Sequence, residues 1–413
     1  MAGTRRIRRV EIARFPQVHG GFNGRRRLVA ATGRTQVINV FQPSLGEREL
    51  AAVRAVFESC WIGKGSRVAA FEAAFAAHIG AAPEQVMSTN SCTEATFLAM
   101  QLLGIGPGDE VVLPTVSFVG TANAIAAHGA RPVFCDVDPR TLNPGVEHVA
   151  AALTPATKAV LVLHYGGYPG QVAQIAELCR SRGIKLIEDA ANAQASTVDG
   201  QACGTFGDIG VWSFDHGKIA VAVDGGMLFA RNAELVEHGR KLAYFGLEQT
   251  SGYDQSMRAH TRWWDFEVSS FSRRSVLNDV LAAIGHVQLD RLAEFVARRR
   301  EIVDAYDKAL EAVPGVLVPP ALPPGHDSSC YLYWVQLDPN LRDGVARRLH
   351  ERGIYTTFRY PQLHKVRAYG AGDLSLPGAG HAGAATLCLP LHQALTDDEV
   401  DFVSTSLIEV LPG

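Results

Sequence analysis

Residues 204–230, GTFGDIGVWSFDHGKIAVAVDGGMLFA, decide the fold of this chain because they place one cation between two apolar runs. The runs 209–214 and 225–230 are short and apolar, which is typical of buried strands. Lys218 lies between them, and an unpaired ammonium is costly to bury. It is therefore either a lysine on a surface turn or an amine whose pKa is lowered so that it can form a Schiff base.

A second stretch, KLIEDA at residues 185–190, favours the chemical alternative. It has the pattern of a buried strand that ends in the carboxylate of Asp189. In open α/β sheets, the carboxyl ends of the strands face the ligand crevice. A Schiff-base lysine and an aspartate that pairs with a pyridinium nitrogen are what pyridoxal 5′-phosphate (PLP) requires. Lys218 and Asp189 are therefore the candidate catalytic residues.

The sequence also contains a strand, a turn and a helix in which small hydroxyl residues open the helix. Residues 86–90 have the pattern of a short strand, residues 91–93 are Ser-Cys-Thr, and residues 94–103 are helical in pattern. Free N–H groups and the dipole at a helix N-terminus favour an anion such as phosphate. Taken alone, the same residues are more typical of an ordinary helix cap.

Strands and helices alternate along most of the chain at the spacing of βαβ units, which predicts an α/β fold. Residues 279–313 are strongly helical and would join two domains. After a Pro-rich stretch the pattern changes to α+β, with strands expected at 330–337 and 355–360. We therefore expect a basic tail at 1–36, a large PLP-binding domain at 37–290 and a small C-terminal domain at 291–413.

The composition, 47% hydrophobic and 20% charged in 413 residues, is that of an ordinary globular protein. The net charge of −3 gives no nucleic-acid signature, and no apolar run is long enough to span a membrane. The segment 1–36 differs, with nine arginines against one acidic residue, and is either an anion-binding arm or a poorly defined terminus. The seven cysteines are scattered, which predicts reduced thiols in the cytoplasm and no metal site.

In order and spacing, a set of short motifs resembles the DegT/DnrJ/EryC1/StrS aminotransferases, from about residue 37 to the C-terminus. The motifs are NSCTEA (90–95), PTVSFVGTANA (114–124), HYGG (164–167), IEDAANA (187–193), GTFGDIGVWSFDHGK (204–218), DGGM (224–227) and LPLH (389–392). The resemblance implies aminotransferase fold type I, with a mostly parallel seven-stranded sheet in the large domain and a smaller α+β C-terminal domain. It also implies PLP as cofactor and a homodimer with shared active sites.

The resemblance gives roles to residues around the cofactor ring. Lys218 would hold PLP as a Schiff base, and Asp189 would keep the pyridine nitrogen protonated. Phe118 would lie against the ring face, or could simply pack in the core. Asn192 stands where the family usually has glutamine and could still bond the PLP 3-oxygen, whereas Gln194 replaces the family's usual histidine.

The resemblance also assigns the phosphate end of the cofactor. Ser213 would bond the phosphate, and Cys92 and Thr93 would bind it through backbone N–H groups, with the Thr93 hydroxyl as a further donor. The partner-subunit asparagine that commonly reaches this phosphate is not evident, and Arg274 falls at its place. Arg274 could pair with the phosphate as a charged fork or be a solvated arginine.

Within the family, the forms WSFD-x-x-K and RGIYTTFRYP look most like the dTDP-4-dehydro-6-deoxy-D-glucose 4-aminotransferases of antibiotic sugar pathways. The implied reaction passes the amino group of L-glutamate to C4 of the nucleotide-linked ketosugar, giving dTDP-4-amino-4,6-dideoxy-D-glucose. Lys64 and Arg262, the latter beside Trp263 and Trp264, are candidates for the substrate diphosphate; each could instead be solvated, and the tryptophans could be packing residues.

Three other functions remain to be weighed. A 3-aminotransferase or an aminocyclitol aminotransferase of the same family would share these motifs, because regiochemistry depends on the shape of the pocket. A PLP-binding regulator without turnover belongs to a different class. The joint presence of Lys218, Asp189 and the phosphate turn weighs against a regulator.

Overall fold

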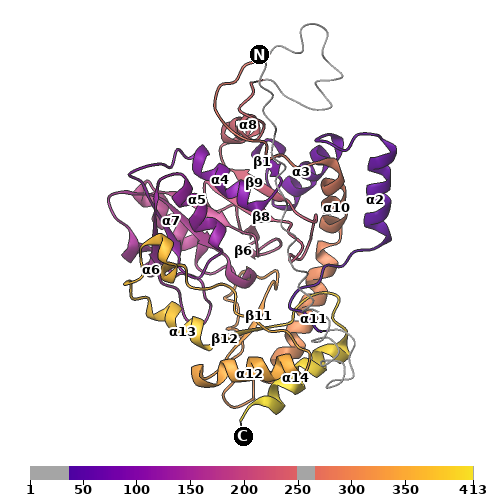
Figure 1. Cartoon of the computed structure of the whole chain (residues 1–413), viewed down its shortest axis with the longest axis vertical. Helices are drawn as coiled ribbons and strands as arrows, with labels where there is room; N and C mark the ends of the chain where they lie inside the picture. Colours follow the sequence, from indigo (N-terminus) through magenta and orange to yellow (C-terminus); the bar gives the residue numbers. More distant parts are fainter. Residues whose placement is uncertain (1–36, 249–265, 413) are drawn as a thin grey trace, which may run out of the picture.

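A seven-stranded sheet forms the centre of the computed structural model, which describes residues 37–248 and 266–412 (Figure 1). The strands are β1 (Val86–Thr89), β2 (Glu110–Pro114), β3 (Arg131–Cys135), β4 (Thr157–Leu163), β5 (Lys185–Asp189), β8 (Ile209–Ser213) and β9 (Gly226–Ala230). They lie in the order β1-β9-β8-β5-β4-β2-β3. Only β9 runs antiparallel to its neighbours. The prediction of a mostly parallel seven-stranded sheet is confirmed.

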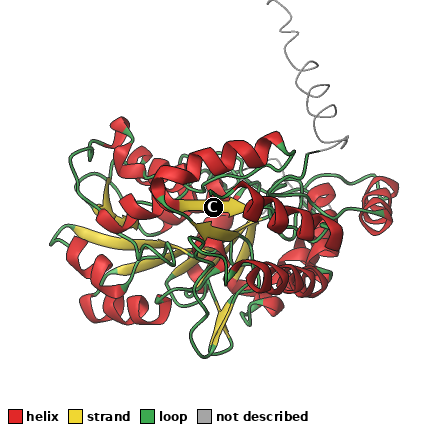
Figure 2. Cartoon of the chain, turned by 90° about the horizontal axis from the view of Figure 1, so that it is seen from below, coloured by secondary structure: helices red, strands yellow, loops and turns green. Residues whose placement is uncertain are grey.

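Helices cover both faces of this sheet (Figure 2). Successive strand residues point to opposite sides, so in β9 Phe229 packs into one hydrophobic cluster and Leu228 into the other. The Phe229 side is covered by α3 (Ser66–His78), α6 (Val146–Ala152) and α7 (Val172–Arg182). The Leu228 side is covered by α4 (Cys92–Leu102), α5 (Val119–Ala127) and α8 (Ala233–Leu242). The near-continuous apolar runs in the strands follow from this double burial.

Several segments with polar side chains meet at the edge of the sheet where the parallel strands have their carboxyl ends. β5 and β8 end there at Asp189 and Ser213, and β1 and β2 lead into the N-termini of α4 and α5. Ser91 caps α4 by accepting a hydrogen bond from the Glu94 amide at 3.2 Å, and Phe118 occupies the N-cap position of α5. Parallel strands bring their carboxyl ends to one edge, which is where α/β proteins bind ligands.

The C-terminal region has a hydrophobic cluster of its own. The helices α10 (Asp279–Asp290) and α11 (Leu292–Leu310) lead into it (Figure 1). It is enclosed by α11, α12 (Pro339–Glu351), α14 (Asp397–Val410) and the antiparallel pair β11 (Tyr333–Gln336) and β12 (Thr386–Leu389). Ile38 also packs into this cluster, so the first described residues join the C-terminal core. The boundary at residue 290 stays a prediction.

The remaining elements are short or peripheral. They are α2 (Glu47–Glu58), α13 (Pro377–Ala385) and a three-stranded sheet of β6 (Thr197–Val198), β7 (Gln201–Ala202) and β10 (His326–Asp327). Among the described residues, no helix is long and apolar enough to cross a membrane.

Two predicted elements differ from the structure. Residues 279–313 form two helices, broken at Arg291, whose guanidinium reaches back to the Ser44 carbonyl and the Glu49 carboxylate. Residues 355–360 form no strand: only Thr357 pairs, in a single bridge with Cys388 of β12. Instead of continuing along β12, this segment contributes side chains to the cavity described next.

Candidate active site

A cavity of about 600 Å³ lies at the carboxyl edge of the sheet. It is lined by the ends of β5 and β8, the first turns of α4 and α5, and residues from segments 39–43 and 355–360. Six of the predicted site residues line it: Cys92, Thr93, Phe118, Asp189, Ser213 and Lys218. The structure therefore brings together residues that are more than a hundred positions apart in the sequence.

Lys218 is buried, with 9% of its surface exposed, and is not a surface-turn lysine. Its Nζ donates to Asn192 Oδ1 at 3.2 Å and lies 4.8 Å from the centre of the Tyr331 ring. Burial by itself lowers the pKa of Lys218, but the Tyr331 and Tyr360 hydroxyls and the Asp189 carboxylate raise it above its ordinary value. In the chain without cofactor, the expected lowering of this pKa is therefore wrong.

Asp189 is buried at the end of β5 and is held on two sides. Its Oδ1 accepts the Ala191 amide at 3.0 Å, and its Oδ2 accepts the Thr121 hydroxyl at 3.4 Å. Burial raises the pKa of Asp189, and these donors together with the positive charge of Lys218 oppose that rise. A carboxylate fixed in this way can stabilise a protonated ring nitrogen placed against it.

The two residues that depart from the family pattern play different parts. Asn192 is buried beside Lys218, and its Nδ2 has no hydrogen-bond partner within the described residues. Gln194 instead bonds the backbone, because its Nε2 donates to the carbonyls of Ser213 and Ala220 and its Oε1 accepts the Ala220 amide. Gln194 therefore fixes the loop that carries Lys218, while the Asn192 amide is free to bond a ligand.

The predicted phosphate turn lies at the N-terminus of α4. The N–H groups of Cys92 and Thr93 belong to the first helical turn, where no carbonyl within the helix can accept them. Ser213, 5% exposed, lines the same cavity from the end of β8. Burial raises the pKa of the Cys92 thiol well above its ordinary value, so this side chain adds no negative charge near a phosphate.

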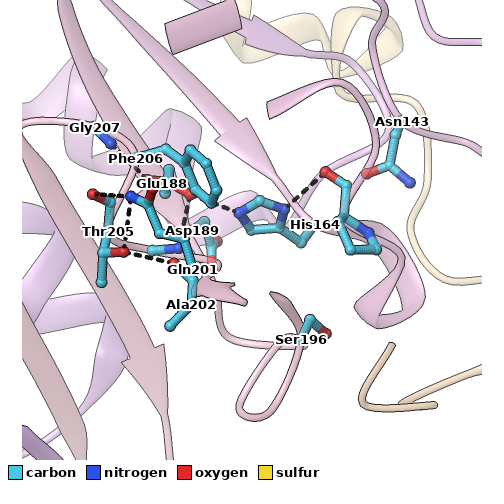
Figure 3. Close-up of polar contacts among 12 residues, drawn as sticks. Asn143, His164, Glu188, Asp189, Ser196, Gln201, Ala202, Thr205, Phe206 and Gly207 are labelled. Atoms are coloured by element: carbon cyan, nitrogen blue, oxygen red, sulfur yellow. Dashed lines mark hydrogen bonds and ion pairs between the residues drawn. The ribbon is translucent and has the colours of Figure 1, made fainter. Parts of the chain in front are cut away.

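Behind Asp189 lies a buried ion pair that the sequence patterns did not reveal (Figure 3). His164 Nε2 is 3.0 Å from Glu188 Oε2, and His164 Nδ1 is 3.2 Å from the Pro169 carbonyl. Both ring nitrogens face acceptors, and although burial lowers the pKa of His164, Cys203 and Glu188 raise it well above its ordinary value, which favours an imidazolium. Glu188 also accepts the amides of Gly204 and Gly207, both at 2.7 Å. The pair therefore anchors the turn that leads into β8.

Aromatic residues from distant segments complete the cavity. Phe118 is 45% exposed, and its ring meets the Tyr360 ring edge-on at 5.9 Å. Phe41 stacks on Tyr331 at 5.3 Å. The motif RGIYTTFRYP contains Arg359 and Tyr360, but the sequence predicted no role for either residue, nor for Phe41 and Tyr331. The position of Arg359 and Tyr360 inside a family motif could have indicated their place in the site. No sequence pattern indicated Phe41 or Tyr331.

Of the other predicted residues that the structure describes, Lys64, Arg274 and Asn192 are not among those that line the cavity. Lys64 lies in a loop that is held by two hydrogen bonds, from Trp61 Nε1 to the Lys64 carbonyl and from the Gly65 amide to Asp279. Burial lowers the pKa of Lys64. Arg274 is exposed, in a backbone bridge with Tyr244. Arg262 falls outside the described residues. Within the described part of the chain, no group of three or more side chains could hold a metal ion.

These donors fit PLP. An amine and a carboxylate share one cavity with unpaired helix N–H groups that suit a phosphate, and an aromatic ring faces the same space. The buried Nδ2 of Asn192, beside Lys218, has no partner among the described residues and is a donor available to a ligand. A mostly parallel sheet with this site at its carboxyl edge defines a PLP-dependent aminotransferase of fold type I.

The chain belongs to the DegT/DnrJ/EryC1/StrS aminotransferase family, whose model matches residues 43–408. It is 58% identical over 368 residues to the dTDP-4-dehydro-2,3,6-trideoxy-D-glucose 4-aminotransferase of Saccharopolyspora spinosa, an alignment that covers 89% of this chain and 95% of that protein.

Solved structures agree with this assignment. The aminotransferase TlmJ from Streptoalloteichus hindustanus is 61% identical, with a TM-score of 0.86 over 91% of this chain and 98% of that one. The sugar aminotransferase CalS13 from Micromonospora echinospora is 28% identical, with a TM-score of 0.81 over 90% and 99% of the two chains.

Proposed function

We propose that this enzyme transfers the amino group of L-glutamate to C4 of a dTDP-linked 4-keto-6-deoxyhexose in the biosynthesis of a secondary metabolite. The observation that carries the proposal is the meeting of Lys218, Asp189 and the α4 N-terminus in one cavity. The 58% identity to a dTDP-sugar 4-aminotransferase supports the substrate class. We take dTDP-4-dehydro-6-deoxy-D-glucose as the substrate; that relative's named substrate differs from it in lacking the C2 and C3 hydroxyls.

Each residue has a defined role in this reaction. Bound PLP supplies an electrophilic carbon that joins amines and a ring that takes up the electrons released when a C–H bond breaks. Lys218 would hold it at rest, remove the α-proton of glutamate and later deliver a proton to C4 of the sugar. Asp189 would keep the ring nitrogen protonated, and the amides of Cys92 and Thr93 would hold the phosphate. The Asn192 amide would bond the ring oxygen.

The finer parts of the proposal concern assembly and surroundings. We propose a homodimer with shared sites, because α2 and the loop after it expose the large apolar side chains Leu50, Phe57 and Ile62, each about 60% exposed. Arg274 would reach the phosphate of the partner subunit. Lys64 and Arg262 stay candidates for the substrate diphosphate. All seven cysteines are free, which supports a reducing compartment such as the cytoplasm.

The test is product identification. The holoenzyme would be incubated with L-glutamate and a panel of ketones: dTDP-4-dehydro-6-deoxy-D-glucose, its 2,3-dideoxy counterpart, a 3-keto isomer and a keto-cyclitol. Mass spectrometry and NMR of the product locate the new amine. An amine at C4 supports the proposal, an amine at C3 or on the cyclitol shifts the assignment within the family, and no turnover with any ketone overturns it.

A further inference from the structure

Arg359 enters the active-site cavity from the C-terminal region and has no established role there. It lines the cavity together with Lys218 and Asp189. Its guanidinium carbon lies 4.5 Å from the centre of the Phe41 ring. Phe41 stacks in turn on Tyr331, whose ring lies under Lys218 Nζ. A continuous series of ring contacts therefore fixes the position of Arg359 relative to the reactive lysine.

Arg359 shares the cavity with the carboxylates of Asp189, Asp215 and Asp224 but is not bonded to any of them. Of the other basic side chains that line the cavity, Lys218 would join the cofactor, and His216 Nδ1 lies 2.9 Å from Asp215 Oδ2.

Within residues 37–248 and 266–412, Arg359 forms no ion pair with a carboxylate, although its side chain is half-buried. Burial lowers the pKa of Arg359, but Tyr331 and Tyr360 raise it above its ordinary value, so the guanidinium stays charged. A charged guanidinium in a cavity, with no carboxylate bonded to it, has donors for an anionic ligand.

We propose that Arg359 is the oxyanion subsite for the substrates of this reaction. This inference rests on the proposed function, in which both substrates are anions: L-glutamate carries two carboxylates, and the sugar nucleotide carries a diphosphate. The planar guanidinium donates two parallel hydrogen bonds, a geometry that matches both a carboxylate and a phosphate. The cofactor phosphate has its own donors at the α4 N-terminus, which leaves Arg359 for the substrate.

Two probes, measured separately, show whether Arg359 binds the carboxylate or the diphosphate. The probes are glutarate, a dicarboxylate without the reactive amine, and dTDP, a diphosphate without the sugar. Their dissociation constants would be measured by calorimetry on the holoenzyme for wild type, Arg359→Gln and Arg359→Lys. Arg347→Gln is the matched control, because Arg347 is an exposed arginine on α12 outside the cavity.

We expect Arg359→Gln to weaken one of the two probes by about 10- to 100-fold, the range for a lost hydrogen bond to a charged group. Arg359→Lys keeps the positive charge but cannot donate two parallel hydrogen bonds, so it should weaken binding of the same probe by a smaller factor. The corresponding half-reaction, followed by cofactor absorbance, should show a raised KM. The probe that weakens identifies the carboxylate or the diphosphate as the group bound.

The outcomes against the inference are equally definite. Unchanged affinity for both probes in Arg359→Gln, or in Arg359→Lys if the glutamine variant does not fold, overturns the subsite. A loss of cofactor affinity with unchanged probe binding would assign Arg359 to PLP and also overturns it. The proposed function is judged by wild type alone: if wild type aminates the ketosugar while the Arg359 variants bind both probes normally, only this inference fails.

Discussion

At the scale of single residues, Lys218 shows how a cation is kept in an apolar setting. Burial of an unpaired ammonium is costly, and the structure offsets that cost with Asn192, an aromatic face and a nearby carboxylate. These neighbours raise the pKa of Lys218, so the amine of the cofactor-free chain is protonated at neutral pH. Only the neutral amine can attack an aldehyde.

Loading of PLP onto the apoenzyme should therefore accelerate with pH. Below a raised pKa, the neutral fraction of an amine grows about tenfold per pH unit, so the rate should climb from about pH 7 to about pH 9 without a plateau. Stopped-flow absorbance after mixing apoenzyme with PLP measures it. In Lys218→Ala, borohydride should fix no cofactor to the protein. A loading rate that is flat over this range would show that the amine is already neutral.

In the proposed reaction, Asp189 would keep the ring nitrogen of PLP protonated. Asp189→Asn keeps the shape and the hydrogen bond to Ala191 but removes the negative charge that holds a proton on the ring nitrogen. Removal of the α-proton of glutamate should slow by at least about 100-fold, while PLP still binds. Single-turnover absorbance with glutamate reports the rate, and a cofactor titration is the control. A near-normal rate would remove Asp189 from this role.

At the scale of elements, the His164–Glu188 pair connects β4, β5 and the turn into β8 (Figure 3). Glu188→Gln would leave the imidazolium buried without its counter-ion, at a cost of about 3–5 kcal/mol in the free energy of unfolding. Adding His164→Asn should recover part of that loss, because no charge is then buried. Urea unfolding of both variants measures the loss of free energy of unfolding. If the single and double variants lose the same amount, Glu188 stabilises the fold only through the hydrogen bonds that it accepts from the Gly204 and Gly207 amides.

The same pair predicts a pH dependence of stability. Burial alone lowers the pKa of His164, but Cys203 and Glu188 raise it well above its ordinary value. A group whose pKa is raised on folding stabilises the fold below its unfolded pKa, and that contribution is lost as pH rises through the folded pKa. The stability gap between wild type and the double variant should therefore narrow in the alkaline range. A gap that widens there contradicts a buried imidazolium.

Sequence patterns predicted the elements that depend on local rules. Strands buried on both faces are apolar runs, and the end of β5 could be recognised because Asp189 ends its run; β8 ends at Ser213, one residue before the predicted end. The pattern missed the break between the two helices at Arg291, whose guanidinium contacts Ser44 and Glu49, residues distant in sequence. The stacking of Phe41, which lines the cavity, on Tyr331 could not be predicted, because it depends on the packing of two distant segments.

At the scale of the whole molecule, the cavity is built from the central sheet and the C-terminal region. Asp189 and Ser213 come from the central sheet, whereas Arg359 and Tyr360 follow residues that pack in the C-terminal core. Arg274 lies outside this cavity but is attached to it indirectly: the carbonyl of the next residue, Ser275, accepts the amide of Asn90, just before the phosphate turn. Whether Arg274 serves its own site or that of a partner is a question of assembly.

Complementation between variants should answer it. Lys218→Ala alone should be inactive, and Arg274→Ala alone should bind PLP weakly because a charged phosphate contact is lost. When the two are co-refolded as a proposed homodimer, half of the dimers are mixed. If Arg274 crosses the interface, each mixed dimer combines the intact Lys218 of one chain with the intact Arg274 of the other.

About a quarter of all sites would then be complete, and glutamate-dependent turnover at limiting PLP should recover to about that share of wild type. If Arg274 acts within its own chain, both sites of a mixed dimer carry one defect, and mixing should restore nothing. Size-exclusion chromatography with light scattering supplies the control for the assembly. A monomer in that measurement would contradict the shared site, because no second subunit would then be present to complete it.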